Sequence, residues 1–159
     1  MTTLRTSPCV GVAHLYLLVR QVEGIDAQHY FMGHYRLETW RHFGEIIQPG
    51  NGRREVVVPS TNPLHANVNL LHYALQELAL TPPAKLVIHH CRKDLPTTCQ
   101  SSAGELYQQV RTDLRLYPQV TWQLENKATL QQRIGLPIRE QQELWVHERH
   151  ITAMKGLYQ

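Results

Sequence analysis

The sequence predicts a mixed α/β fold in which helices cover the faces of one β-sheet. The first part of the chain holds segments rich in β-branched and aromatic residues, separated by turn signals. An amphipathic helical pattern follows from Ser60 to Leu80, and after it come a short apolar strand, a second helical pattern and another strand. The predicted order is β-β-β-α-β-α-β-α, with one possible extra strand in the first half. Hairpins form its antiparallel part, and helical crossovers return the later strands to the same sheet.

The first two predicted strands form a hairpin. Val10–Arg20 is apolar and ends at a turn formed by Gly24, Ile25 and Asp26. Gln28–Leu37 contains three aromatic residues, which favour a strand. The following residues, Glu38–Phe43, are compatible with either a short helix or a loop.

A second hairpin is predicted between Gly44–Gln48 and Arg53–Val58. The two segments flank Pro49, Gly50, Asn51 and Gly52. Asn-Gly tolerates the positive φ angles that tight hairpin turns require. This pattern therefore predicts a turn between two paired strands.

The segment Ser60–Leu80 is predicted to be an amphipathic helix. Asn62 is a favourable N-cap residue, and Pro63 suits the first helical position, where its missing N–H group costs no hydrogen bond. Apolar residues then recur at spacings of three and four, which places them on one face of the helix. They are Leu64, Val68, Leu71, Leu75 and Leu78. Prolines at 82 and 83 end the helix.

The second half of the chain alternates strands and helices. Lys85–His90 is a predicted strand whose consecutive apolar residues suit burial on both faces. A capping box from Ser102 to Glu105 predicts the start of a helix, and Val120–Leu124 is the next predicted strand. The last segment begins at Leu136 and is predicted to be a helix that includes Glu143. A strand at 143–147 is the alternative.

Composition indicates one folded domain over residues 1–159. Hydrophobic residues make up 42 % and charged residues 18 % of the chain, as in folded rather than disordered proteins. The three cysteines include no CxxC pair, which argues against a disulfide framework and a zinc ribbon. The longest apolar run is interrupted by His14 and is shorter than a membrane span of about 20 residues. We therefore predict a cytoplasmic protein that does not enter a membrane.

The order of elements and several short phrases resemble the ribonuclease H family. These phrases are Thr61-Asn62 before a helix that contains Ala74 to Leu78, then Leu86 to Ile88, and Trp122 followed by Lys127. The resemblance extends over most of the chain from Val10 onward and implies a single RNase H-like domain. It also implies four carboxylates that hold two magnesium or manganese ions on either side of the scissile phosphate.

Most of these carboxylates are missing from the expected positions. The family's first Asp lies in the first strand, but Val10–Val19 contains no acidic residue, and its polar candidates are His14 and Tyr16. The family's Glu lies in the first turns of the first helix, where this chain has Asn67. The residues at or near the last two Asp positions are His89, His90, Cys91 and Asp94, and then Gln142 and Glu143. At most one carboxylate matches, so we expect the standard nuclease activity to be lost.

Imidazole and thiolate side chains near the end of a central strand suggest a replacement metal site. His90 and Cys91, with His14 on a neighbouring predicted strand, are ligand types that zinc prefers. The opposing interpretation, which we favour, is that adjacent strand residues point to opposite faces. His89 and His90 then cannot reach the same ion.

Basic residues suggest a nucleic-acid partner. The net charge is +3 and the pI is about 8.9, which permits such binding without demanding it. Short concentrations occur at Arg53-Arg54 and at Arg92-Lys93, and we predict that these four residues contact phosphates. The main hypothesis is a catalytically inactive RNase H-like domain that acts as a nucleic-acid-associated binding module and needs no cofactor.

Two alternatives remain open. The first is a divergent metal-dependent nuclease that uses magnesium or manganese, with a rearranged site of Asp94, Glu143, His90 and Glu77. The second is a protein-interaction or structural domain without nucleic-acid contact. In that case a long edge strand such as Arg53–Val58 could pair two chains in a homodimer.

Overall fold

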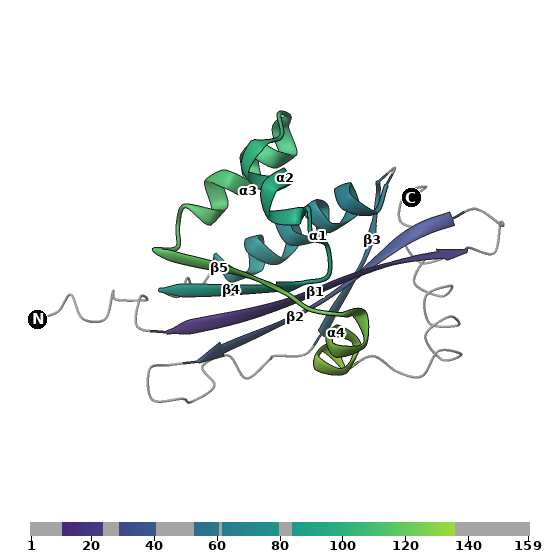
Figure 1. The fold of residues 1–159 in the computed structure, drawn as a ribbon, viewed down its shortest axis with the longest axis horizontal. Coiled ribbons are helices and arrows are strands. Elements are labelled where there is room, and N and C mark those ends of the chain that lie inside the picture. The colour runs from purple at the N-terminus through teal and green to yellow at the C-terminus, as the bar shows by residue number, and fades with distance from the viewer. Residues whose placement is uncertain (1–10, 24–28, 41–52, 61, 80–83, 136–159) are drawn as a thin grey trace, which may run out of the picture.

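The computed structural model describes residues 11–23, 29–40, 53–60, 62–79 and 84–135. Within these ranges it contains five strands and four helices (Figure 1). The strands are β1 (Val12–Glu23), β2 (His29–Trp40), β3 (Arg53–Val58), β4 (Lys85–His90) and β5 (Gln119–Leu124). The helices are α1 (Pro63–Leu78), α2 (Leu95–Ser101), α3 (Glu105–Leu114) and α4 (Lys127–Ile134). No helix in these ranges has the length and apolar character needed to cross a bilayer.

The strands form one mixed sheet with the order β3-β2-β1-β4-β5. β2 is antiparallel to both of its neighbours, β1 and β3, whereas β4 is parallel to both β1 and β5. Parallel neighbours require crossover connections. Here α1 connects β3 to β4, and α2 with α3 connects β4 to β5. This topology confirms the predicted mixed sheet with helices on its faces.

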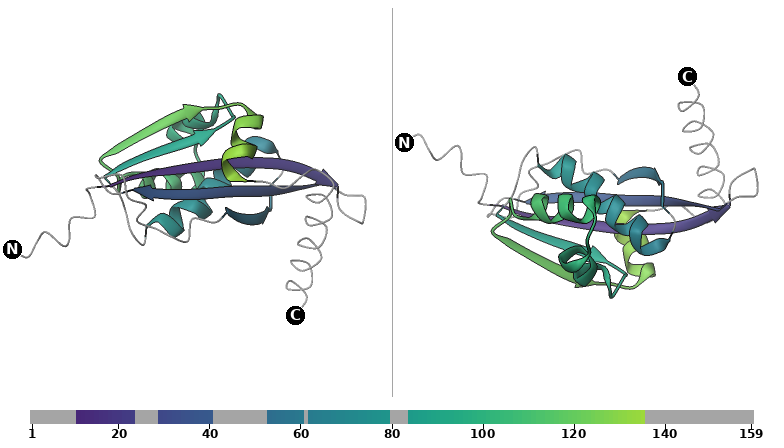
Figure 2. Two further views of the ribbon diagram at one scale, coloured as in Figure 1. Left: turned by 90° about the horizontal axis from the view of Figure 1, so that it is seen from below. Right: turned by 90° about the horizontal axis from the view of Figure 1, so that it is seen from above.

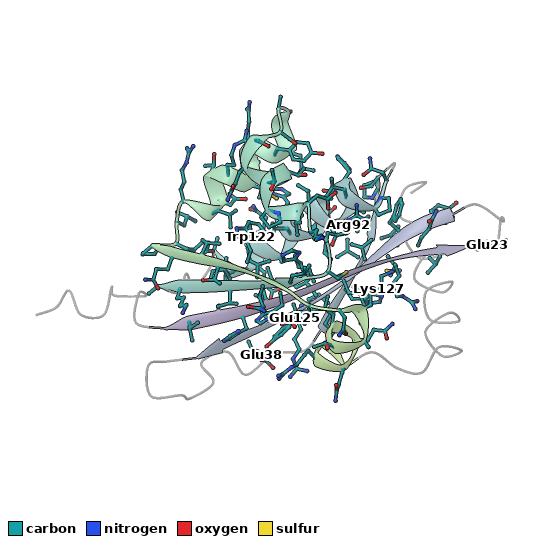
Figure 3. The ribbon with its side chains drawn as sticks, viewed as in Figure 1. Glu23, Glu38, Arg92, Trp122, Glu125 and Lys127 are labelled. Atoms are coloured by element: carbon teal, nitrogen blue, oxygen red, sulfur yellow. The ribbon has the colours of Figure 1, made fainter. Side chains whose placement is uncertain are left out.

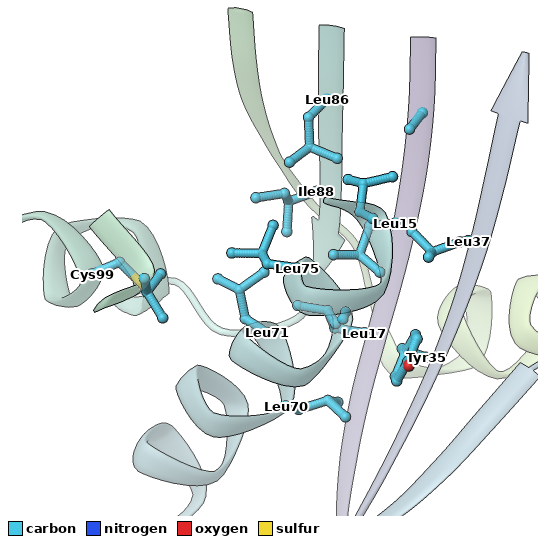
Figure 4. Packing of buried hydrophobic residues seen from close by; sticks show 14 of the residues in the cluster. Leu15, Leu17, Tyr35, Leu37, Leu70, Leu71, Leu75, Leu86, Ile88 and Cys99 are labelled. Atoms are coloured by element: carbon cyan, nitrogen blue, oxygen red, sulfur yellow. The ribbon is translucent and has the colours of Figure 1, made fainter. Parts of the chain in front are cut away.

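One face of the sheet, which we call the α1 face, lies under α1, α2 and α3 (Figure 2). Asn62 caps α1, because its Oδ1 accepts a hydrogen bond of 2.8 Å from the His65 backbone N–H. The apolar stripe of α1 then packs on alternate residues of the central strands and forms the larger hydrophobic core (Figure 4). Core members from these elements include Leu15, Leu17, Leu71, Leu75, Leu86 and Ile88.

Gly33 in β2 allows α1 to lie close to the sheet. A Cβ added at this position would stand 2.6 Å from Leu70 Cδ1 and 3.0 Å from Val58 Cγ2. Both distances are shorter than ordinary van der Waals contact, so a larger residue would force its neighbours to move. The missing side chain therefore makes room for the buried Leu70 of α1.

The opposite face, which we call the α4 face, is covered among the described residues by α4 (Figures 1 and 2). Leu130 and Ile134 of α4 pack on Tyr16 and Leu18 of β1, with Cys91 beside them. This second cluster is much smaller than the core on the α1 face. Polar side chains of the central strands, among them His14 and His89, also lie on the α4 face.

The sequence does not predict α2 or α4, and the predicted capping box is wrong. Ser102 is the C-cap of α2, where its backbone N–H donates to the Thr98 carbonyl. The next helix begins after Gly104, whose φ is 122° and which makes no side-chain cap. Arg111 Nη1 donates to the carbonyls of Cys99 and Ser102, at 2.9 Å each, and so fixes the end of α2 against α3. Ser102 therefore ends one helix instead of starting another.

The strand boundaries also differ from the predictions. β1 continues to Glu23 and β2 to Trp40, and the two pair along their whole length, so Glu38 belongs to a strand. Arg53–Val58 is confirmed as a strand, and it lies at the edge of the part of the sheet that the structure describes. The predicted strand at 44–48, the turn at 49–52 and the predicted last helix or strand after Leu136 lie outside the described residues.

Candidate functional site

The polar side chains of β1 and β4 divide between the two faces of the sheet. Tyr16 of β1 is the register partner of His89 of β4. His89 contacts Tyr16 and His14 on the α4 face, whereas His90 contacts Trp122, which packs against the core of the α1 face. Adjacent strand residues thus lie on different faces. The structure therefore places His14 beside His89 instead of beside His90.

Asn67 stands in the first turns of α1, where the resemblance expects a glutamate. Its side chain is buried, with 2 % of its surface exposed. Nδ2 donates to the Pro63 carbonyl at 2.9 Å, and the buried Oδ1 has no hydrogen-bond partner in the part of the chain that the structure describes. A neutral amide here provides an oxygen atom but not the negative charge of a carboxylate.

His90 ends β4, where the resemblance expects an aspartate. It is buried, and its ring meets Trp122 edge-on at a centroid distance of 5.9 Å. Its Nδ1 accepts a hydrogen bond of 3.2 Å from the Arg92 backbone N–H. Burial lowers the pKa of His90, because the charged ring would lose its hydration. The side chain is therefore a neutral, hydrogen-bonded part of the interior at neutral pH.

Cys91 and Asp94 follow His90 but do not form a site with it. Cys91 lies in the apolar cluster under α4, and burial raises the pKa of its thiol. This disfavours the thiolate that zinc binding requires. The exposed Asp94 has Oδ1 at 3.4 Å from Arg92 Nε. Within the described ranges, no group of three or more His, Cys, Asp and Glu side chains could hold a metal ion.

Glu77 lies in a polar network near β2 and β3, on the other side of β1 from β4. Its Oε1 accepts a hydrogen bond of 2.9 Å from the Tyr35 hydroxyl and lies 3.5 Å from Arg54 Nε. Tyr35 and Arg54 are register partners in β2 and β3, whereas Asp94 follows β4 on the far side of β1. The structure thus places Glu77 and Asp94 in different networks. Glu143, the third carboxylate of the nuclease alternative, lies outside the described residues.

A hydrogen-bonded chain of Glu125, His89 and His14 lies on the α4 face. His89 Nδ1 is 2.8 Å from Glu125 Oε2, and His89 Nε2 is 2.9 Å from His14 Nδ1. With Glu125 ionised, His89 donates from Nδ1, so its Nε2 accepts from His14 Nδ1–H; this tautomer follows from the hydrogen bonds. Tyr16 stacks on His89 at a centroid distance of 4.3 Å. The sequence does not reveal this chain, because its members come from β1, β4 and the residue after β5.

The surroundings of His14 and Tyr16 favour the uncharged form of each of these two side chains. Burial lowers the pKa of His14, and the nearby His89 lowers it further, whereas Glu38 opposes both. Burial raises the pKa of Tyr16, and Glu38 adds to this through its charge and a hydrogen bond. Both nitrogens of His89 and Nδ1 of His14 take part in the chain. His14 Nε2 is therefore the nitrogen that can take up a further proton without breaking it.

The four predicted nucleic-acid contact residues fall into two separate groups. Arg53 and Arg54 belong to the edge strand β3, and Arg92 and Lys93 lie in the turn between β4 and α2. β2 and β1 stand between the two groups. Arg54 is paired with Glu77 and Arg92 with its near neighbour Asp94. The structure therefore does not combine the four residues into one surface.

Two further basic residues, Lys127 and Arg133, are exposed on α4. They are not among the predicted contact residues, because the sequence does not predict α4. A signal was present, since Asn126 is a favourable N-cap and Gly135 ends the helix in the left-handed conformation, with φ of 81°. Only two side chains of this short helix are buried, so its apolar periodicity is too weak to mark it.

Comparisons with known proteins identify the fold. No protein-family model and no curated protein matches the sequence. The structure is similar to RNase H1 from the halophilic archaeon Halobacterium salinarum NRC-1, with a TM-score of 0.52 and 11 % identity over 76 % of this chain and 89 % of that chain. It is also similar to the N-terminal RNase H domain of Rv2228c from Mycobacterium tuberculosis, with a TM-score of 0.52 and 8 % identity over 75 % and 90 % of the two chains.

A third similar structure is LC11-RNase H1, which was solved in complex with an RNA/DNA hybrid. Its TM-score is 0.51, with 9 % identity over 75 % of this chain and 87 % of that chain. These similarities confirm that the chain has an RNase H-like fold. At such low identity they concern the fold alone, and function has to be argued from the side chains.

Proposed function

We propose that this RNase H-like domain binds nucleic acid and does not cleave it by the two-metal carboxylate reaction. The side chains at the centre of the sheet support this proposal most directly. β1 contains no acidic residue before Glu23, the first turns of α1 contain Asn67, and β4 ends in His90. Two magnesium or manganese ions need several oxygen ligands with negative charge. An amide and a buried neutral imidazole do not supply them.

Nucleic acid is the partner class that the fold and the charge favour. LC11-RNase H1 was solved in complex with an RNA/DNA hybrid. The present chain has a net charge of +3, with Arg and Lys side chains on more than one part of its surface. Contacts between such cations and phosphates are independent of base sequence and weaken as salt is added. A binding module with phosphate contacts therefore fits the charge distribution better than a sequence-specific reader.

A combined binding and cleavage titration tests this function. The full chain is mixed with fluorescein-labelled RNA–DNA hybrid, duplex DNA or single-stranded RNA, at about 50 mM and about 200 mM salt. Each mixture is examined without metal and with magnesium, manganese or zinc. We expect binding that weakens at the higher salt concentration and nucleic acid that stays intact with every metal.

Two results would contradict the proposal and indicate a different function. Cleavage that requires a metal would favour the divergent nuclease, and Asp94→Ala and Glu143→Ala would then show whether these carboxylates act. The absence of binding at the lower salt concentration would favour a protein partner. Measurement of the mass in solution would then test a homodimer paired through β3.

A further inference from the structure

The surface around α4 contains more positive charge than nearby carboxylates neutralise. α4 has no acidic residue, and its two basic residues, Lys127 and Arg133, are exposed. Lys93 is exposed in the turn before α2. The ion pairs of the described residues include none of these three cations. Their charges are therefore available to an anionic partner.

Carboxylates near this surface already have partners. Asp94 pairs with Arg92 at 3.4 Å, and Glu38 pairs with Arg36 at 3.4 Å. Glu125 accepts the hydrogen bond from His89 and lies at the base of α4, immediately before its N-cap. Among the described residues, α4 and its surroundings thus contribute five cations and three carboxylates, which leaves an excess of positive charge. The cations are Arg36, Arg92, Lys93, Lys127 and Arg133.

The loop before α2 and the start of α4 lie close together. Burial raises the pKa of Cys91, and the charges of both Lys127 and Arg92 oppose this effect, which requires both to be near the thiol. Figure 3 shows Arg92 and Lys127 in the same region, where β4 ends and α4 begins. Cations that are far apart in the sequence are therefore neighbours on one surface.

The far end of α4 extends the same surface toward β2. Arg36 Nη1 lies 3.9 Å from the point where a Cβ would stand on Gly135, the residue that ends α4. Lys127 and Arg133 are six positions apart, which corresponds to about 9 Å along a helix axis and about 120° around it. One DNA strand presents a phosphate about every 3.4 Å along the duplex axis. A single strand can therefore place more than one phosphate beside α4.

We propose that α4 and the turn between β4 and α2 form the surface that binds the phosphate backbone of nucleic acid. Its central residues are Lys93, Lys127 and Arg133, with Arg36 and Arg92 at its sides. This inference rests on the proposed function and locates it on the α4 face. It differs from the sequence prediction, because it replaces the pair Arg53 and Arg54 by residues of an unpredicted helix.

The β3 group is less suited to bind phosphate. Arg54 already lies 3.5 Å from Glu77, which also accepts a hydrogen bond from Tyr35. A phosphate at Arg54 would have to compete with this carboxylate. Lys127 and Arg133 have no such competitor among the described residues. The two groups therefore differ in available charge as well as in position.

Two paired variants with the same loss of charge separate the two surfaces. Lys127→Gln/Arg133→Gln removes two charges from α4, and Arg53→Gln/Arg54→Gln removes two from β3. Binding of a fluorescein-labelled RNA–DNA hybrid is measured by anisotropy over a series of salt concentrations. We expect the α4 pair to raise Kd about tenfold at low salt and to reduce the slope of log K against log salt by about two. The β3 pair should change Kd by less than about threefold.

A charge-preserving variant, Lys127→Arg/Arg133→Lys, controls for damage to α4. It should bind like the wild type, because both charges remain. If it binds more weakly, the effect of the Gln pair does not come from lost phosphate contacts, and the proposal is overturned. Equal losses in the two Gln pairs, or a larger loss in the β3 pair, would also overturn the assignment of the surface. In each of these cases the wild type still binds, so the proposed function stands. If the wild type does not bind at any salt concentration, the proposed function itself fails, and this inference fails with it.

Discussion

The two faces of the sheet differ in how they are covered and in the polar groups they contain. On the α1 face, three helices enclose a large core, and the polar residues Asn67 and His90 are buried within it. On the α4 face, the described part of the cover is one short helix over a small apolar cluster, beside a hydrogen-bonded histidine chain and exposed cations. This contrast indicates that the α1 face provides most of the stability. Three exposed cations without a carboxylate partner among the described residues, Lys93, Lys127 and Arg133, lie on and near α4.

The largest expected loss of unfolding free energy comes from truncating a buried leucine, and one leucine from each face is compared. Leu75→Ala in α1 should lower the free energy of unfolding by about 3–5 kcal/mol, because the enclosed core cannot collapse around the cavity. Leu130→Ala in α4 should cost about 2–3 kcal/mol, since its small cluster can relax more easily. Both side chains are fully buried, which makes them a matched pair. Urea unfolding of the two variants measures the difference, and equal losses would contradict the contrast between the faces.

The histidine chain should make a smaller contribution to stability. Glu125→Ala removes the acceptor of the 2.8 Å bond from His89 and leaves a nearly buried N–H without it. We expect a loss of about 1–2 kcal/mol, measured by the same urea unfolding. Glu105→Ala, an exposed carboxylate in the first turn of α3, serves as a control and should cost less than about 1 kcal/mol. If Glu125→Ala costs no more than this control, the chain does not stabilise the fold.

Alanine substitutions at two glycines should lower the free energy of unfolding by similar amounts but for different reasons. Gly33→Ala should cost about 1 kcal/mol, because the new Cβ meets Leu70. Gly135→Ala should also cost about 1 kcal/mol, because its φ of 81° is unfavourable for a residue with a side chain. Double-mutant cycles with Leu70→Ala measure the difference. Part of the Gly33→Ala cost should vanish in the Leu70→Ala background, and the Gly135→Ala cost should not. The reverse result would show that contact with Leu70 does not cause the Gly33→Ala cost.

The smallest expected effect is a pH dependence that arises from His14. The pKa of His14 in the folded state is lower than its ordinary value of 6.5, chiefly because of burial. The folded state therefore binds this proton more weakly than the unfolded state. The stabilisation is present above pH 6.5 and is lost as the pH falls through the lower folded-state pKa.

Unfolding at several pH values between about 7.5 and 5 checks this dependence. His14→Gln should flatten the loss of stability on the acidic side, relative to the wild type. His65→Gln, in the first turns of α1, provides a histidine control away from the chain. An unchanged pH dependence in His14→Gln would exclude this histidine as its source.

The sequence predicts most of the sheet because local signals agree with the final packing there. The strand Arg53–Val58 has the predicted bounds, and the helix that begins at Asn62 and Pro63 has both its predicted cap and its predicted apolar face. These features depend on residues close together in the chain. The sequence also indicates that His14 lies on a strand beside Lys85–His90, but His14 contacts His89 there instead of His90.

The missed features depend on contacts between distant residues. Ser102 and Glu105 have the spacing of a capping box, but α2 ends at Ser102, and Arg111 of α3 binds the carbonyl groups of that end. The histidine chain cannot be predicted without knowing which residue follows β5 and on which face of the sheet His89 lies. The α4 surface combines cations from three separate parts of the chain. No local sequence pattern predicts that these residues lie close together.

A two-dimensional NMR titration of the full chain with a short RNA–DNA hybrid, in the presence of magnesium, tests most directly whether this domain binds nucleic acid at α4 without cleaving it. We expect shifts concentrated at residues 91–94 and 126–134, together with a hybrid that stays intact throughout. Shifts concentrated in β3, or around Asn67 and His90, would contradict the division between the two faces. Cleavage of the hybrid would contradict the proposal that this domain binds without cutting.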